Sequence, residues 1–304
     1  INGEDPGRNF LPAPGVLLVD KPGGMTSHDV VARARKALGT RKIGHAGTLD
    51  PMATGLLVLG VEAATRLLTF IVGLDKTYEA TIRLGASTDT DDADGEIVAV
   101  TDAAAVDSAA VSRAIADLTG EISQVPSRVS AIKVGGRRAY DLARAGEEVE
   151  LAARTVTVSR FDVREERRDG GFLDLDVVVD CTSGTYIRAL ARDLGAALGV
   201  GGHLTALRRT RIGPFGVEGA ASVDDLATAA LRDPAQVAAA VLGAFSVSSD
   251  EARDLRHGKR LTGAAARLEA GRAAIDPDGR LIGVVERRGD DVKSAMNMPE
   301  EASG

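Results

Sequence analysis

The sequence predicts an α+β fold, with a mixed, mainly antiparallel sheet flanked by helices and a small β-rich domain at the C-terminal end. Three observations support this. Strand-like and helix-like segments are interleaved, a glycine turn joins two long alternating segments, and the segments become short from about residue 245. A chain of 304 residues favours one large domain plus a small one. We expect a flexible leader at 1–14, a large domain over 15–244 and a small domain over 245–304.

The first half of the chain contains three predicted strands and two predicted helices. GVLLVD (15–20) reads as a buried strand, and Thr26 or Ser27 caps an amphipathic helix over 28–39. GLLVLGV (55–61) has strand character, and period-two alternation over 76–88 predicts a half-buried strand followed by the polar turn TDTDDADG. A second helix over 106–120 ends at a glycine.

The second half begins with a predicted hairpin. Alternation over 155–166 and 171–184, separated by RRDGG, predicts an antiparallel pair of strands. Glycines close a helix predicted over 184–202. An alanine-rich helical region over 222–245 contains Pro234 as an internal break. Beyond it, DPDG (276–279) reads as a tight turn between two short strands.

Composition indicates an ordinary globular protein. Hydrophobic residues make up 44% of the chain and charged residues 27%. Glu62 and Arg66 interrupt the longest apolar runs, so no membrane helix is expected, and the leader lacks the pattern of a secretory signal. The single cysteine, Cys181, fits a reducing compartment, which favours the cytoplasm. We assign Cys181 no role beyond packing in a strand.

The charge distribution is uneven, although the net charge is −7. Residues 89–121 carry nine acids against the single base Arg113, whereas 127–144 and 186–213 each have a local balance of +4. Such basic clusters are able to follow a phosphate backbone at short range. From charge alone, two solvated faces are the favoured interpretation.

Several familiar sites are excluded by spacing. GHAGTLDP lacks the lysine and hydroxyl residue of a P-loop, and TDTDDADG would place threonines at two ligand positions of a calcium loop. One cysteine and four histidines without ligand spacing build no zinc site, so we expect no metal and no cofactor. Asp174 and Asp176 resemble the paired acids of phosphoaspartate hydrolases, but RRDGG precedes them, which favours exposed strand residues.

The segment GHAGTLDPMATG (44–55) is shaped to display polar side chains. Pro51 biases Asp50 towards an extended backbone, and the glycines permit turns that other residues resist. We expect a loop that caps a sheet and presents His45 and Asp50. The alternative is that Asp50 only accepts hydrogen bonds from neighbouring amides within the turn.

The same segment resembles the first motif of the TruB-type tRNA pseudouridine synthases, with Ala46 in place of the usual threonine. DKPGGMTSH, KTYEATIRLGASTDTDDADG, VPSRVSAIKVGGRRAYDLARAG, CTSGTYIRALARDLG and GGHLTALRRTRIG match further motifs in the family's order, over residues 16 to about 217. The resemblance implies the pseudouridine synthase fold, a cytoplasmic enzyme, and isomerisation of the T-arm uridine of tRNA (position 55). The tail over 245–304 is similar to a PUA-like RNA-binding module.

The resemblance also implies roles for residues of the reaction. Asp50 is the nucleophile, Arg188 its cationic partner, and Asp92 the acid that orients Arg188. Attack on the sugar, attack on the base and simple stabilisation of the detached uracil all remain open. Tyr78 lies against the target base and Tyr186 is a second pocket tyrosine, for which core packing is the alternative.

Further residues are implied to hold the RNA. His45 fills the space left by the flipped nucleotide and Leu207 lines the pocket. A thumb insertion over about 124–152 closes on the RNA. Lys21 is implied to lie near the active site, and a structural role in the DKPGG turn is an equally good interpretation. The remaining implied contacts are basic residues of the thumb and of the 203–213 segment: Lys133, Arg137, Arg138, Arg144, Arg208 and Arg209.

Two other functions remain open on the sequence. An RNA-binding or RNA-folding module needs the thumb and the tail but no reactive acid. A carboxylate-using hydrolase is the alternative enzyme, and a magnesium requirement would distinguish it from the isomerase. For the isomerase we expect tRNA as the partner, with no membrane, no metal and no obligate protein partner.

Overall fold

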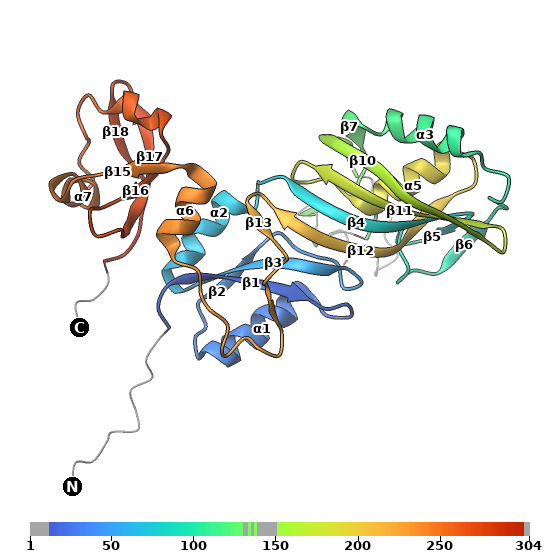
Figure 1. Cartoon of the computed structure of the whole chain (residues 1–304), viewed down its shortest axis with the longest axis horizontal. Coiled ribbons are helices and arrows are strands. Elements are labelled where there is room, and N and C mark those ends of the chain that lie inside the picture. Colours follow the sequence, from blue (N-terminus) through green and yellow to red (C-terminus); the bar gives the residue numbers. More distant parts are fainter. Residues whose placement is uncertain (1–11, 130–132, 135–136, 139–150, 301–304) are drawn as a thin grey trace, which may run out of the picture. The chain divides into compact units, whose positions relative to one another are not determined.

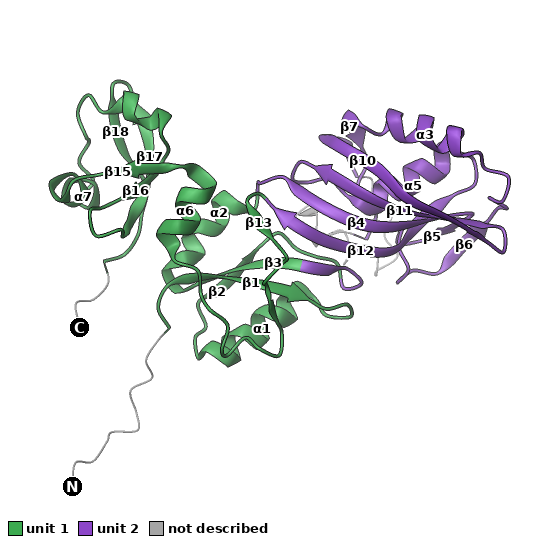
Figure 2. Ribbon diagram, in the orientation of Figure 1, with its two compact units in different colours: residues 1–50, 56–72, 213–304 green, residues 51–55, 73–212 purple. Residues whose placement is uncertain are grey.

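The computed structural model describes residues 12–129, 133–134, 137–138 and 151–300. Residues 1–11 of the predicted leader and Arg144 of the predicted thumb lie outside the described residues. The chain divides into two compact units (Figure 2): unit 1 contains residues 1–50, 56–72 and 213–304, and unit 2 contains residues 51–55 and 73–212. None of the described helices combines the length and the apolar character needed to cross a membrane.

Unit 1 combines mainly short helices with two groups of strands (Figure 1). Its helices are α1 (Ser27–Leu38), α2 (Leu68–Ile71), α6 (Pro234–Leu242) and α7 (Ser249–Arg256), with 3-10 turns η1 (Glu62–Leu67) and η2 (Ala265–Glu269). Its strands are β1 (Gly15–Lys21), β2 (Ile43–Ala46), most of β3 (Thr54–Val61), β13 (Phe215–Gly216), β14 (Ala221–Ser222), β15 (Ala244–Ser246), β16 (Ala273–Ile275), β17 (Leu281–Arg288) and β18 (Asp291–Asn297).

Unit 2 is a sheet of long strands with helices against it. Its helices are α3 (Ser108–Asp117) and α5 (Ile187–Ala197), and α5 packs on β12 and β4. Its strands are β4 (Lys76–Leu84), β5 (Ala86–Thr88), β6 (Ile97–Val100), β7 (Gly120–Gln124), β8 (Lys133–Val134), β9 (Arg137–Arg138), β10 (Arg154–Asp169), β11 (Phe172–Cys181) and β12 (Gly202–Ile212).

The strand pairing is mixed and mainly antiparallel, which confirms the predicted fold class. In unit 1 the order β14-β1-β3 contains a parallel β14–β1 pair, and β2 pairs antiparallel with β3. In unit 2 the order β12-β4-β11-β10-β7 is antiparallel throughout. The sheet β15-β16-β17-β18 forms the predicted β-rich tail, and its β16–β17 connection contains the predicted DPDG turn.

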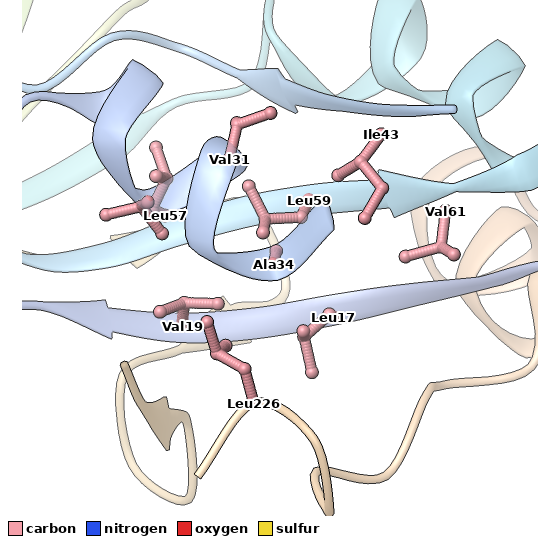
Figure 3. Close-up of a cluster of buried hydrophobic side chains, with 10 residues drawn as sticks. Leu17, Val19, Val31, Ala34, Ile43, Leu57, Leu59, Val61 and Leu226 are labelled. Atoms are coloured by element: carbon pink, nitrogen blue, oxygen red, sulfur yellow. The ribbon is translucent and has the colours of Figure 1, made fainter. Parts of the chain in front are cut away.

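The core of unit 1 joins α1 to β1, β2 and β3 (Figure 3). Thr26 begins α1 through a capping box with Asp29, and Gly39 ends it with a left-handed backbone, φ 67°. The helix then presents one apolar stripe to the strands. The buried cluster consists of Leu17, Val19, Val30, Val31, Ala34, Ile43, Leu57, Leu59, Val61 and Leu226.

The sheet of unit 2 has one apolar and one polar face. Tyr78, Ala80, Ile82 and Leu84 alternate along β4 on the buried face. On the other face Arg83 pairs with Asp174 at 2.7 Å, and the Thr81 hydroxyl donates to Asp176 at 2.6 Å. Asp174 and Asp176 are therefore strand residues in a polar ladder, as the sequence analysis favours.

Three expectations about element bounds are wrong. The strand predicted over 76–88 is divided at Gly85, where φ is 109° and a Cβ would lie 3.1 Å from the Thr101 carbonyl oxygen. His45 lies within β2 rather than in a loop, because β2 pairs with β3 and its residues Ile43 and Ala46 are buried within unit 1. Only 234–242 of the alanine-rich 222–245 region is α-helix. Its proline occupies the first turn and Asp233 caps it, so Pro234 starts this helix instead of interrupting it.

Strand β12 has no counterpart in the sequence analysis, which assigns no element to 203–213. Its pairing with β4 shifts register between Leu204 and Ala206 and again between Arg209 and Arg211. Each irregularity inserts a residue and breaks the period-two pattern that identifies a strand. The strand that carries three of the candidate site residues, Leu207, Arg208 and Arg209, therefore lacks the alternation by which a sequence pattern predicts a strand.

Replacing Leu59 with alanine should lower the free energy of unfolding by about 2–5 kcal/mol, because Leu59 is fully buried in the unit 1 core. Leu38→Ala is the matched control, since Leu38 is only partly buried at the edge of the same cluster. Urea denaturation followed by circular dichroism measures both. Equal losses for the two variants would contradict the placement of Leu59 at the centre of this core.

Candidate functional site

A buried ion pair joins Arg188 of α5 to Asp92 in the turn after β5. Their charged atoms, Nη1 and Oδ2, lie 3.4 Å apart, and the two side chains are 4% and 5% exposed. Arg188 also donates to the carbonyl oxygens of Thr90 at 3.0 Å and Val129 at 2.8 Å. The contact of Asp92 with Arg188 that the family resemblance implies is thus present in the structure. The parts of the two residues in a reaction stay predictions.

The turn around Asp92 fixes the orientation of its carboxylate. The Thr90 hydroxyl donates to Oδ1 at 2.6 Å and the Asp94 amide donates to the same oxygen at 3.1 Å. Asp91 adopts a positive φ of 63°, and its carbonyl accepts from the Leu204 amide of β12 at 3.0 Å. Since Oδ1 is held by the turn, Oδ2 is the oxygen directed to Arg188.

The apolar face of the unit 2 sheet brings Tyr78, Leu207 and Arg209 together. Arg209 lies opposite Tyr78 and Leu207 lies opposite Ala80 in the β12–β4 register, and directly opposed residues share a face. All three are buried, at 8%, 7% and 1% exposure respectively. Arg208 lies opposite Glu79 on the other face, where its Nη1 donates to the Thr54 hydroxyl at 3.4 Å.

Tyr186 begins α5 and is held by a buried amide. The Gln124 side chain accepts from the Tyr186 amide at 2.8 Å and donates to the Tyr186 carbonyl at 3.1 Å. The Arg154 guanidinium lies over the tyrosine ring, 5.5 Å from its centroid. The backbone just before Arg188 is thereby fixed. Gln124 is fully buried, and sequence analysis misses it because a lone glutamine carries no motif.

In unit 1, the segment leading to Asp50 is tied to the start of α1. The buried Ser27 hydroxyl accepts from the Leu49 amide at 2.9 Å and donates to its carbonyl at 3.2 Å. Asp50 follows directly and is half-buried. It ends its segment of unit 1 and is bonded to Pro51, the first residue of unit 2. The half-buried His45 ring lies edge-on to His28, with centroids 5.6 Å apart.

The other predicted residues occupy different surroundings. Lys21 is fully buried, and its ammonium donates to the carbonyls of Pro22 at 2.9 Å and Met25 at 2.7 Å, which fits the structural interpretation. Lys133, Arg137 and Arg138 lie on the β8–β9 pair. Across the described residues no group of three or more His, Cys, Asp or Glu is arranged to hold a metal ion.

Lys76 is a buried cation that the sequence analysis leaves out. It precedes Tyr78 by two positions on β4, so both side chains lie on the same face, and it is 6% exposed. Its ammonium donates to the Leu74 carbonyl at 2.7 Å. Burial and repulsion from the Arg209 guanidinium lower the pKa of Lys76 to about 8. The signal was the lysine of KTYEA, since a lysine at a buried position of a strand is rare.

Replacing Asp92 with asparagine should lower the free energy of unfolding by about 3–5 kcal/mol, because the buried Arg188 guanidinium loses its ion pair with Asp92. Asp94→Asn is the matched control: Asp94 is exposed in the same turn, and its loss should cost within about 0.5 kcal/mol. Thermal and urea unfolding of both variants provide the measurement. Similar stabilities for the two would argue against a buried pair.

The pKa of Lys76 predicts a pH-dependent stability. Its folded pKa, about 8, lies below the ordinary value of 10.5, so the folded chain binds fewer protons between these values. Stability due to this group therefore rises with pH across that window and is lowest below it. Relative to Lys76→Met, the wild type should gain free energy of unfolding from about pH 8 to about pH 10.5. Lys36→Met changes an exposed lysine and is the matched control, so the difference in unfolding free energy between it and the wild type should stay constant over this pH range. A constant difference between Lys76→Met and the wild type would refute the assignment.

Comparisons with known proteins cover nearly the whole chain. Three family descriptions match successive segments: the N-terminal domain of the TruB family pseudouridylate synthases at 35–187, the tRNA pseudouridylate synthase B C-terminal domain at 188–245, and the C-terminal domain of tRNA pseudouridine synthase II at 242–299.

Individual relatives agree with this. A protein named tRNA pseudouridine synthase B from Leifsonia xyli subsp. xyli is 56% identical over 293 residues, 94% of this chain and 97% of that one. The protein of the same name from Nocardia farcinica is 58% identical over 93% of each chain. A solved H/ACA RNP bound to a substrate RNA containing 2′-deoxyuridine has a chain 25% identical, with TM-score 0.68, covering 94% of this chain and 85% of that one. By these matches along its length, the chain belongs to the TruB family of pseudouridylate synthases.

Proposed function

We infer that this protein is a tRNA pseudouridine synthase, an isomerase that converts a uridine of tRNA to pseudouridine. The observation that carries the inference is the match, over 93–94% of this chain at 55–58% identity, to relatives named tRNA pseudouridine synthase B. We further propose the T-arm uridine (position 55) as the target, because the motifs of this chain resemble that branch of the family.

The atoms and electrons of this isomerisation balance without a cofactor. The bond from C1′ of the ribose to N1 of uracil breaks, and a bond from C1′ to C5 forms. The proton lost from C5 is matched by one gained at N1, so substrate and product are isomers. The protein must therefore hold a detached uracil while it turns, and it must provide a group that adds and leaves reversibly.

Asp50 is the proposed nucleophile. A carboxylate is able to form and release a covalent bond without an outside energy source. The Ser27 hydrogen bonds to Leu49 support this, because they fix the backbone immediately before Asp50. Arg188 is the proposed cation that keeps Asp50 ionised, and its orientation by Asp92 limits the directions its guanidinium can take.

The target uridine lies inside a folded loop of tRNA, so reaching it requires extrusion at a cost of a few kcal/mol. We propose that Tyr78 stacks on the extruded base and Leu207 lines the same pocket, as their shared face of the sheet supports. Tyr186 completes the pocket, and His45 fills the space that the base leaves. The proposed RNA contacts of the thumb and of β12 are electrostatic, from Lys133, Arg137, Arg138, Arg144, Arg208 and Arg209.

For the organisation of the chain we propose a catalytic domain over 15–244, with its thumb at about 124–152, and a PUA-like RNA-binding domain over 245–304. The four-stranded sheet β15-β16-β17-β18 supports the second of these. The buried cluster of Phe245, Val247, Leu255, Ile282, Val285 and Val292, among others, gives that segment a core of its own. We also propose a cytoplasmic location, which the single cysteine of the chain favours.

Asp50→Asn should abolish pseudouridine formation while leaving tRNA affinity within about twofold, because the amide keeps the shape but loses the nucleophile. Release of tritium from C5-labelled uridine in an unmodified tRNA transcript measures turnover, and filter binding measures affinity.

The turnover of Arg188→Lys in the same assay should be severely impaired, since a point charge replaces a planar guanidinium with two prongs. Arg192→Lys is its control, one turn later on α5 and only half-buried.

Three outcomes would count against these roles. Full turnover by Asp50→Asn would refute the nucleophile. Equal activity of Arg188→Lys and Arg192→Lys would refute the special part of Arg188. Tight tRNA binding by the wild type without any tritium release would favour the RNA-binding module over the enzyme.

A further inference from the structure

Strand β6 is apolar and exposed along its whole length. Ile97, Val98 and Val100 are 60%, 63% and 65% exposed, and Ala99 between them is exposed as well. Among the described residues only two other large hydrophobic side chains are exposed, Val72 at 43% and Val125 at 45%. Clustered exposure of this kind marks interaction sites, whereas single exposed valines are common.

The same strand has an open hydrogen-bonding edge. Among the described residues β6 pairs only with β5, in a two-stranded ribbon, and β5 also contacts β12. In such a ribbon every second residue directs its N–H and C=O away from the partner strand. The pairing is irregular only between Ser87 and Thr88. The sequence IVAV carries none of the lysines or prolines that protect ordinary sheet edges.

The surroundings of this edge are strongly acidic. The segment 89–107, which includes β6, contains no base, and five of its seven acids are exposed; the other two, Asp91 and Asp92, pair with Arg192 and Arg188. Asp94 and Glu96 before the strand and Asp102 after it are exposed. An RNA backbone or a second copy of this chain would bring like charges together here, whereas a basic segment would be attracted.

We propose that the β6 edge, residues 97–100, is a docking site for a partner protein, which adds an extended segment of alternating apolar and basic residues as a third strand beside β5 and β6. Main-chain hydrogen bonds to the open edge supply the affinity, and contact with the exposed valines and acids supplies the selectivity. The proposal is independent of the reaction, because it uses none of the residues assigned to it.

A peptide that alternates valine with lysine and threonine is a suitable probe. It should bind the full chain and protect from hydrogen exchange the amides within 97–100 that point away from β5. Its counterpart with glutamate in place of lysine should bind at least about tenfold more weakly, because it repels the acidic surroundings. A third peptide with proline at two valine positions should also lose affinity, since proline donates no ladder hydrogen bond.

Variants of the chain complete the test. Val98→Thr with Val100→Thr keeps β propensity but removes apolar contact, and should weaken binding of the basic peptide at least about tenfold. Val72→Thr is the matched control at an exposed valine of unit 1 and should bind as the wild type does. Unchanged unfolding midpoints establish that the variants fold.

Four results would overturn the proposal. They are absence of binding by the basic peptide, equal affinity for the basic and acidic peptides, protection of amides elsewhere, and unchanged affinity in the double variant. Two further measurements identify other occupants. A dimer in sedimentation that the double variant abolishes would assign the edge to a second copy, and a selective loss of tRNA affinity would assign it to RNA.

Discussion

The buried contact between Arg188 and Asp92 is the constraint on which the arrangement of the unit 2 site depends. Two charges that are almost fully removed from water are tolerated only when each is paired and hydrogen-bonded. The structure meets this requirement from three segments: the turn after β5, the start of α5, and the carbonyl of Val129 at the border of the predicted thumb. Displacing any one of these segments breaks the ion pair or one of its hydrogen bonds, so the pair fixes their positions together.

The unit 2 sheet separates structure from chemistry by using its two faces differently. One face carries an acid ladder on β11, Asp174, Asp176 and Asp180, whose partners on β4 and β10 hold the strands in register. The other face carries the buried Tyr78, Leu207 and Arg209, together with Lys76. Because alternation places neighbours on opposite faces, the stabilising contacts and the candidate pocket occupy the same sheet without competing for space.

Much of the architecture could be predicted from the sequence, because the local signals agreed with the packing. The capped helix α1, the hairpin of β10 and β11, and the DPDG turn each have a strong periodic or turn pattern. Pattern analysis failed where the regular period is broken. The two irregularities in β12 remove the alternation that predicts a strand, and Pro234 reads as a break although Asp233 caps the helix whose first turn contains this proline.

The residues of the candidate site also divide into some that the sequence predicts and others that it does not. Asp92 and Arg188 were identifiable from motifs, since chemistry restricts the residue types that serve there. Gln124 and Lys76 were not, because their importance comes from complete or nearly complete burial beside Tyr186 and Tyr78, which only tertiary packing reveals. The glycines beside His45 predict a loop, whereas burial of Ile43 and Ala46 stabilises a strand there.

The single thiol of the chain has a practical consequence. Cys181 is 2% exposed at the end of β11, and burial raises the pKa of its thiol to about 11. The reactive thiolate is therefore scarce at neutral pH and shielded from reagents. A cysteine introduced anywhere on the surface would be labelled essentially alone, so fluorescent or spin probes can be attached in the native background without first removing a wild-type residue.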